Sequence, residues 1–311
     1  MVLLGVCVYL ALLAWSHVVI SNQHESASPP SDESGLAALV AGEQSVLIPR
    51  MNDAGPILNL PPQRIAYRRW EPSTPENKTV ESEYNPEESS PVVVLLHGSP
   101  GAASNFSVLG PALAARGYRV LAPDLPGFGA SSKRVPSYSI LAHARAVLAM
   151  LDTLGIERFH VVGWSQGGGV ALHMADLAPK RTASLTMLAS IGDQRAEGSG
   201  SYAFEHAKYA LGYVGLVLGA ELVPHFGVLG SYEDRNAFIR NFWDSDQRPL
   251  RGIMEHLRTP TLIIHGVHDP LVPIWGARLH HDLIKTSTLL VLDASHFIPF
   301  TDADQAADAM A

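Results

Sequence analysis

The sequence predicts an α/β protein with a mostly parallel sheet that carries helices on both faces. Three observations lead to this fold class. Strand-like and helix-like segments alternate along the chain from residue 63 onward. Residues 91–97 are a continuous β-branched and aliphatic run, which is typical of a strand buried on both faces. The 311 residues, of which 47% are hydrophobic and 17% charged, have the composition of a folded globular chain.

The expected elements follow one another in repeated strand–helix–strand units, which place the strands parallel in one sheet. Strands are expected over residues 64–70, 91–97, 118–125, 158–163, 183–190, 261–265 and 288–292. Helices are expected over residues 106–116, 140–154, 167–177 and 275–284. The first two helices stop at Gly117 and Gly155. Residues 71–90 are polar and acidic, which indicates a loop.

The N-terminal segment is apolar over residues 2–20, interrupted only by Ser16 and His17. About twenty such residues suffice for a helix to cross a bilayer core. The run is longer than the apolar core of a typical signal peptide, and no clean cleavage site follows it. We therefore expect residues 1–20 to be a transmembrane helix, as a membrane anchor or signal, followed by a linker over residues 21–45.

This segment predicts a membrane-anchored protein on the cell-envelope or extracytoplasmic side. Its orientation is left open, because no Lys or Arg precedes Arg50.

The rest of the chain divides into a core and an insertion. We expect the core at residues 46–192 and 259–311, and a mainly helical cap at residues 193–258. Within the cap, residues 209–230 are apolar, with Glu221 as the only acid and no Lys or Arg. A second membrane span there is excluded, since it would separate two strands that must share one sheet. Five glycines and Pro224 also suit a bent lid.

Charge and cysteine content exclude several functional classes. The formal net charge is −8 and no Lys/Arg cluster is present, which argues against nucleic acid as a partner. A single cysteine, Cys7, excludes an internal disulfide framework and a Cys-rich zinc module. Four histidines lie close in sequence without an H-E-x-x-H pattern, so neither a metal nor another cofactor is expected: His265, His268, His280 and His281.

Residues 163–167, G-W-S-Q-G, match the pattern G-x-S-x-G. The match lies where an expected strand ends and a helix begins, the setting in which a sharp turn lifts a serine hydroxyl above the sheet. Gly163 and Gly167 are expected there because side chains would collide where strand and helix approach. The helix N-terminus behind Ser165 favours developing negative charge. We therefore expect Ser165 to be a nucleophile.

A serine nucleophile needs a base and an acid that orients the base. His296 follows the last expected strand, which places it at the same sheet edge as Ser165. Asp269 follows the preceding strand and lies between Ser165 and His296 in chain order. We expect His296 as the base and Asp269 as the acid, with Asp193 and Asp293 as rivals for the acid.

The oxyanion of an acyl-transfer intermediate needs preorganised N–H donors. One is expected from the backbone of Gln166, directly after the nucleophile. The other is expected from the backbone of Ser99, in the tight H-G-S-P-G loop at residues 97–101. Asp124, in a turn after another strand, is interpreted as structural.

Five motifs in this order resemble the α/β-hydrolase superfamily, especially its esterase, haloperoxidase-like and C–C-bond-hydrolase branches. They are HGSPG at 97–101, DLPGFGAS at 124–131, GWSQGG at 163–168, HGVHD at 265–269 and ASHF at 294–297. The resemblance covers about residues 64–300. It implies an eight-stranded, mostly parallel sheet with a cap over a Ser165, Asp269 and His296 triad. Epoxide hydrolases and haloalkane dehalogenases carry Asp where this chain has Ser165, and the glycine-rich elbow differs from that of proline iminopeptidases.

The expected function is that of a serine hydrolase acting on a small-molecule carboxylic ester or related acyl substrate. The apolar cap suggests that this substrate is hydrophobic. C–C bond hydrolysis of a diketone-like substrate and an aminopeptidase-type hydrolysis remain as alternatives within the same fold. A non-catalytic, receptor-like use of the fold is the alternative outside enzymes, although no triad member is missing.

Overall fold

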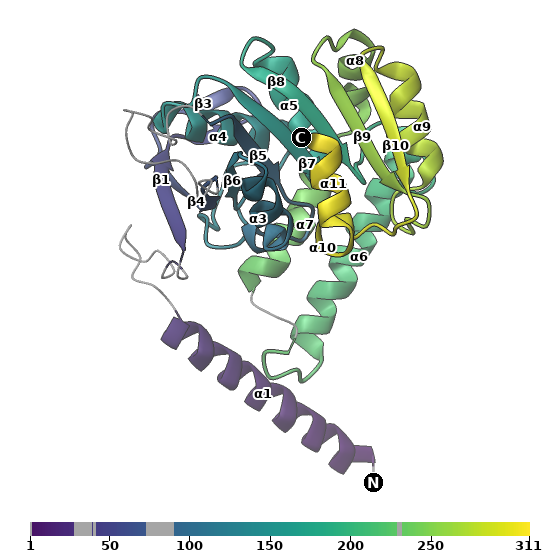
Figure 1. The fold of residues 1–311 in the computed structure, drawn as a ribbon. Coiled ribbons are helices and arrows are strands. Elements are labelled where there is room, and N and C mark those ends of the chain that lie inside the picture. The colour runs from purple at the N-terminus through teal and green to yellow at the C-terminus, as the bar shows by residue number, and fades with distance from the viewer. Residues whose placement is uncertain (1, 28–38, 40–41, 73–89, 229–231) are drawn as a thin grey trace.

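Eight strands form one sheet in the computed structural model, which describes residues 2–27, 39, 42–72, 90–228 and 232–311 (Figure 1). The strand order is β1-β4-β6-β5-β7-β8-β9-β10. Strands β5 to β10 pair in parallel, whereas β4 pairs antiparallel with both β1 and β6. The strands are β1 (Glu43–Ile48), β4 (Gln63–Trp70), β5 (Val92–Leu96), β6 (Arg119–Pro123), β7 (Phe159–Trp164), β8 (Thr182–Leu188), β9 (Thr261–Gly266) and β10 (Ser287–Leu292). The predicted α/β-hydrolase fold with a mostly parallel eight-stranded sheet is confirmed.

Helices cover both faces of this sheet and enclose two hydrophobic cores. Helices α4 (Ile140–Thr153), α5 (Gln166–Leu177), α8 (Arg248–His256) and α9 (Ile274–Leu283) contribute to one core. The opposite core contains residues of the 3₁₀ helix η2 (Ala103–Phe106), α3 (Leu109–Ala115), α10 (Ile298–Thr301) and α11 (Ala303–Met310). Strand β5 alternates between them, with Val94 in the first core and Val93 in the second. Both faces of β5 are therefore buried, as its β-branched sequence predicted.

The expected strands all occur, with ends within two residues of the prediction. One helix differs, because α3 begins at Leu109 rather than at residue 106. The residues before α3 form η2, in which Phe106 is buried. Its apolar side chain continues the spacing of α3, and this is why the sequence predicted a longer helix. Strand β1 and the short hairpin of β2 (Arg50–Asn52) and β3 (Gly55–Ile57) were not predicted. Most of the loop expected at 71–90 lies outside the described residues.

The N-terminal helix α1 (Val2–Ala27) extends seven residues beyond the expected apolar segment. The sequence offers neither Gly nor Pro between residues 21 and 27, so nothing interrupts the backbone hydrogen bonds before Pro29. Most of the expected linker lies outside the described residues. By length and composition, α1 is the one helix of the described part that could cross a membrane, and its apolar residues are nearly all exposed.

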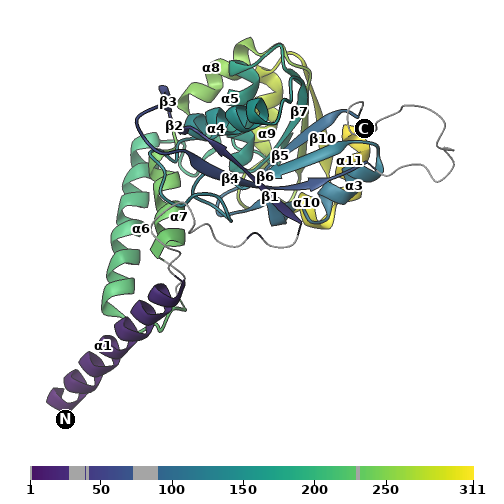
Figure 2. The same cartoon turned by 90° about the vertical axis from the view of Figure 1, so that its left-hand side faces the viewer.

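The segment expected as a cap contains η3 (Gln194–Ala196), α6 (Tyr202–Leu222), α7 (Tyr232–Asp244) and α8. Helix α8 packs against α5 and α9 beside the sheet. Helices α6 and α7 pack against each other and project from the body toward α1 (Figures 1 and 2). Of the helices in the segment expected as a cap, only α6 and α7 therefore project away from the body of the protein.

Candidate active site

Ser165 lies in a sharp turn between β7 and α5. Its backbone has φ +56° and ψ −121°, a left-handed conformation that a non-glycine residue adopts only under strain. Three backbone hydrogen bonds hold the turn: the amide of Ser165 donates to Leu188, and the carbonyl of Ser165 accepts from Gly168 and Ile191. The partly exposed hydroxyl is thereby presented at the carboxyl edge of the sheet.

The glycines beside Ser165 allow the strand and the helix to approach closely. A Cβ built on Gly163 would lie 2.2 Å from the carbonyl oxygen of Gly167. A Cβ on Gly167 would lie 2.1 Å from the carbonyl oxygen of Leu96. Both distances are far below van der Waals contact, and both neighbours are backbone atoms that cannot turn away.

We expect Gly167→Ala to destabilise the protein by about 3 kcal/mol or more, because the clash forces backbone atoms of β5 or α5 to shift. Gly252→Ala is the matched control, since its Cβ would meet nothing within 4 Å inside α8. The control should gain about 0.5–1 kcal/mol from its higher helix propensity. Urea unfolding of both variants measures the effect, and equal stability of the two would contradict it.

His296 and Asp269 lie in the loops after β10 and β9, at the same edge of the sheet as Ser165. Nδ1 of His296 lies 2.7 Å from Oδ2 of Asp269, and both side chains are almost completely buried. Since a carboxylate only accepts, Nδ1–H donates and Nε2 is left as the basic nitrogen. The indole of Trp164 donates to the carbonyl of His296 at 2.9 Å, which ties this loop to the residue before Ser165.

Asp269 is held in its ionised form by several donors. Burial alone would raise the pKa of Asp269, but the hydrogen bond from His296 and those from the backbone amides of Leu271 and Val272 outweigh it. The net result is a pKa below the ordinary value of an aspartate. An ionised Asp269 can orient the imidazole of His296 and stabilise its protonated form.

The two rival acids have other partners. Asp193 accepts hydrogen bonds from the side chains of Arg195 and Arg251, at 2.9 Å and 2.7 Å. Asp293 is exposed and lies 2.9 Å from His268. The described residues show neither carboxylate in contact with His296, so the geometry favours Asp269 as its partner.

The loop after β5 brings Ser99 to the nucleophile. A Cβ on Gly98 would lie 2.9 Å from the Cβ of Ser165, which shows how closely the loop packs on the elbow. The buried His97 orders this loop, because its Nδ1–H donates to the Gly98 carbonyl and its Nε2 accepts from the Leu125 amide. Burial lowers the pKa of His97, consistent with this neutral tautomer.

Asp124 is structural in the same region. Its carboxylate accepts from the backbone amides of Ala103 and Ala130, and its carbonyl accepts from Ser131. These bonds join the DLPGFGAS turn to η2.

Gln166 joins the elbow to the projecting helix α7. As the first residue of α5, it has a backbone N–H without an acceptor inside the helix. Its side-chain amide pairs with that of Asn241 through two hydrogen bonds, and its Nε2 also reaches Ser245. His143 donates to the same Asn241 oxygen at 3.3 Å, and burial lowers the pKa of His143 to about 4. Sequence reasoning missed Asn241, because no local pattern marks a contact made across 75 residues.

Ser99, Ser165 and Gln166 line one cavity of about 80 Å³, closed by residues of α6 and α7 and of the segments that follow β8, η3 and α7. Ser99 Oγ is buried and has no hydrogen-bond partner among the described residues. The remaining lining residues are Ile191, Glu197, His206, Tyr209, Phe242, Ser245 and Gln247.

Glu197 is the one carboxylate in this lining, and the lining has no Lys or Arg. Its oxygens accept hydrogen bonds from Tyr209, Gln247 and Gln194. Burial and the Glu197 carboxylate both raise the pKa of Tyr209, so its phenol remains a donor. The sequence alone gave no sign of Glu197, which lies in an irregular stretch after β8.

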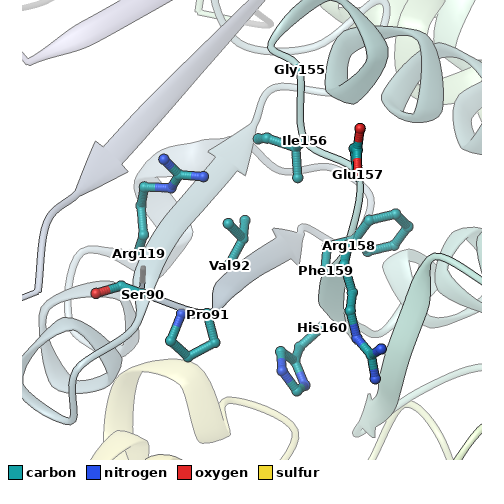
Figure 3. Close-up of a pocket in the computed structure, with 10 residues that line it drawn as sticks. All are labelled: Ser90, Pro91, Val92, Arg119, Gly155, Ile156, Glu157, Arg158, Phe159 and His160. Carbon is teal, nitrogen blue, oxygen red and sulfur yellow. The ribbon is translucent and has the colours of Figure 1, made fainter. Parts of the chain in front are cut away.

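A larger cavity of about 390 Å³ opens at the opposite edge of the sheet (Figure 3). Residues at the amino ends of β5, β6 and β7 line it, among them Arg119, Arg158 and His160. None of Ser165, Asp269 and His296 reaches it, because they lie beyond the carboxyl ends of the strands.

The four clustered histidines have separate partners. His265 donates to the Val272 carbonyl, and His280 accepts from the Asp193 amide. His268 contacts Asp293, and His281 contacts Ser287. Within the described ranges no group of three or more His, Cys, Asp or Glu side chains could hold a metal ion.

Comparison with known proteins gives consistent matches. A family model described as the α/β hydrolase fold matches residues 91–213. The chain is 33% identical over 227 residues to the 2-hydroxy-6-oxononadienedioate/2-hydroxy-6-oxononatrienedioate hydrolase of a Pseudomonas species, covering 61% of this chain and 78% of that protein. It is 30% identical over 237 residues to the dihydrolipoyllysine-residue acetyltransferase component of the acetoin cleaving system of Pseudomonas putida. That match covers 68% of this chain but only 60% of the relative.

Among solved structures, a hydrolase from Pseudomonas aeruginosa PA01 superimposes with a TM-score of 0.60. It shares 22% identity, and the match covers 80% of this chain and 94% of that chain. At this level of identity the likeness concerns the fold.

Proposed function

The chain belongs to the α/β-hydrolase fold family, and from that premise we propose that it is a serine hydrolase that cleaves an uncharged carboxylic ester through an acyl-enzyme. One observation carries the proposal: the buried His296–Asp269 pair lies at the same sheet edge as the strained Ser165. Ser165 in turn shares a cavity with Ser99 and Gln166.

The proposed reaction proceeds in two halves. Nε2 of His296 takes the proton of the Ser165 hydroxyl while Oγ attacks the ester carbonyl carbon. The backbone amides of Ser99 and Gln166 donate to the oxyanion that forms. The intermediate then expels the alkoxide, which receives the proton from His296 and leaves as an alcohol. A water molecule, deprotonated by His296, attacks the acyl-serine, and its collapse releases the acid and restores Ser165.

The negative charge of Glu197 favours the binding of an uncharged substrate over that of an anionic one. One of the relatives is named for a dienedioate substrate, which is an anion. A carboxylate in the cavity, without a Lys or Arg beside it, would repel such a substrate at close range. C–C hydrolysis of anionic diketone-like compounds is therefore the second candidate, favoured by the sequence similarity and opposed by the charge of the cavity.

The size of the cavity supports a small acyl group. Its volume of about 80 Å³ lies well below the roughly 300–1,000 Å³ of drug-sized ligand sites. The sequence suggested a hydrophobic substrate from the apolar stretch at 209–230, but only Tyr209 of that stretch lines the cavity. The other described residues of the stretch, 210–228, do not line the cavity, so they carry no information about the acyl group.

Substrate charge tests the proposal. We expect p-nitrophenyl acetate to be hydrolysed with a kcat/KM roughly 10- to 100-fold above that of the anionic p-nitrophenyl glutarate, because Glu197 repels the second carboxylate. Glu197→Gln should bring the two values together. Glu157→Gln removes the same charge at the opposite sheet edge and serves as the matched control (Figure 3). The ratio of the two kcat/KM values measures the effect without depending on the amount of folded protein.

Two results would contradict this proposal. A ratio unchanged by Glu197→Gln would remove Glu197 from substrate selection. Cleavage of 2-hydroxy-6-oxo-6-phenylhexa-2,4-dienoate with a kcat/KM above that of any ester would establish the C–C hydrolase alternative.

We also propose that α1 anchors the protein in a membrane. The proposal is supported by its length and by its exposed apolar surface, since Leu3 and Trp15 are 77% and 62% exposed.

A further inference from the structure

The outer half of α6 is apolar all round and yet uncovered. Every residue from 211 to 219 is apolar, aromatic or glycine. None of these nine residues is buried, and Leu211 is 74% exposed. A helix that is apolar on all sides is normally enclosed by protein or by lipid. This part of α6 therefore lacks the cover that its sequence requires.

The same surface continues through the turn after α6. Val223, Phe226 and Val228 are exposed there, with Val228 at 87%. Lys and Arg are absent from residues 209–230, and Glu221 is the only acid. Residues 211–228 are called the α6 tip below. Glu221 is the only Asp, Glu, Lys or Arg in it.

Helix α1 lies directly against the α6 tip (Figures 1 and 2). The rings of Trp15 and Phe226 pack edge to face, with centroids 5.7 Å apart. The Tyr9 hydroxyl donates to the carbonyl of Leu222, and Nε2 of His17 lies 3.0 Å from the carbonyl oxygen of Glu221. His17 also lies 4.0 Å from the Glu221 carboxylate, so the one acid of the tip has its partner on α1.

From this arrangement we infer that the α6 tip is a second membrane-embedded element, which enters the lipid bilayer beside α1. The bilayer supplies the apolar cover that the tip lacks. The inference rests on α1 being in the membrane, and it is independent of the hydrolase chemistry.

The lengths of the two helices agree with insertion into one leaflet. From Leu211 to Leu222 α6 rises about 17 Å, and since its end meets α1 at an angle (Figure 1), this length is an upper limit on the depth that it reaches. On α1, the contact residues His17 and Tyr9 lie about 8 and 20 Å from Asn22, measured along the axis. If Asn22 marks the membrane surface, the end of the tip reaches a depth of about 14 Å, midway between these contacts.

A protein partner fits these observations less well than lipid does. Helix α1 is almost entirely exposed from Val2 to Asn22, and only Ala220 and His225 of the tip are buried. A second copy of the chain would have to cover the apolar surface of both helices on all of their sides. A bilayer covers such a surface on every side without a complementary shape.

Insertion of the tip would bring the cavity-lining part of α6 close to the membrane surface. His206 and Tyr209, which line the cavity, precede the tip on the same helix. A substrate that partitions into lipid could then reach the cap without crossing bulk water.

Fluorescence quenching in liposomes tests the inference on the full-length chain. Cys7→Ser provides a cysteine-free background, in which Leu218→Cys on the tip is labelled with an environment-sensitive NBD dye. Leu10→Cys on α1 is the positive reference, and Leu58→Cys, in the exposed loop after β3, is the negative one. Phosphatidylcholine vesicles are prepared with and without doxyl-labelled lipid chains.

We expect doxyl lipids to quench the dye at positions 218 and 10 by at least about two-fold and to leave position 58 unchanged. Three results would overturn the inference. The dye at 218 could behave like that at 58, which would place the tip in water. It could be shielded from aqueous iodide but not reached by doxyl lipid, which would show cover by protein. A dye at position 10 that is not quenched would remove α1 from the membrane, and with it the basis of the inference.

Discussion

Ser165→Ala is expected to lower kcat for an activated ester by about 10⁴- to 10⁶-fold, because removal of the nucleophile leaves only the oxyanion donors and substrate binding. The change deletes a single oxygen from a partly exposed side chain. It leaves in place the backbone hydrogen bonds of Leu188, Gly168 and Ile191 that hold the turn. The melting temperature should therefore stay near that of the wild type.

Labelling with a fluorophosphonate probe checks this expectation directly. The probe should label the wild type at Ser165, and the label should be absent from Ser165→Ala. Ser104→Ala, at an exposed position in η2, is the matched control and should be labelled like the wild type. Labelling that persists in Ser165→Ala, or a folded wild type that neither reacts nor hydrolyses any ester, would favour the non-catalytic, receptor-like alternative.

The parallel strands could be predicted because each has an apolar sequence that indicates burial on both faces. Residues such as Val93 and Val94 alternate between two apolar cores, so both faces of β5 must be apolar. The elbow was predictable for a similar reason. A Cβ on Gly163 would lie about 2 Å from a backbone oxygen of the same turn, and one on Gly167 would lie as close to Leu96 of β5. Both glycines are visible in the sequence.

The antiparallel edge could not be predicted in the same way. Strand β1 lies at the border of the sheet and pairs only with β4, and Ile48 is its only buried residue. Leu47, for example, is 52% exposed. A short edge strand of this kind is specified by its partner more than by its own residues.

The sequence also could not predict that α6 projects outward. Its apolar composition was recognised, but composition does not say whether a helix faces the cavity, another helix or lipid. Glu197 and Asn241 were missed because their contacts join segments far apart in the chain. Gln247 reaches Glu197 across 50 residues, and Gln166 reaches Asn241 across 75.

Asp269→Asn is expected to lower kcat by about 10⁴-fold with little loss of stability. An asparagine in this place still accepts the backbone amides of Leu271 and Val272 through one oxygen. It would, however, present an amide N–H to Nδ1 of His296, which stabilises the tautomer that has its proton on Nε2. That tautomer cannot take the proton of Ser165, so the binding of substrate is retained while the chemical step fails.

Asp193→Asn is the matched comparison, since the side chain of Asp193 is also almost completely buried and Asp193 was the main rival for the role of the acid. We expect its kcat to stay within about three-fold of the wild type, because its partners are Arg195 and Arg251 rather than His296. Its stability should instead fall by about 1–3 kcal/mol at neutral pH. Burial raises the pKa of Asp193 but the bonds from Arg195 and Arg251 lower it further, so its stabilising effect is present above the unfolded pKa of about 4 and is lost on acidification.

The two substitutions therefore separate catalysis from stability. Steady-state kinetics should show the loss in Asp269→Asn alone. Thermal unfolding should show the loss in Asp193→Asn alone, and that difference from the wild type should shrink as the pH falls below about 4. The reverse pattern would assign the orienting acid to Asp193, and the 2.7 Å contact between Asp269 and His296 would then be structural. The contrast holds because both carboxylates are charged and buried, so only the identity of their partners distinguishes them.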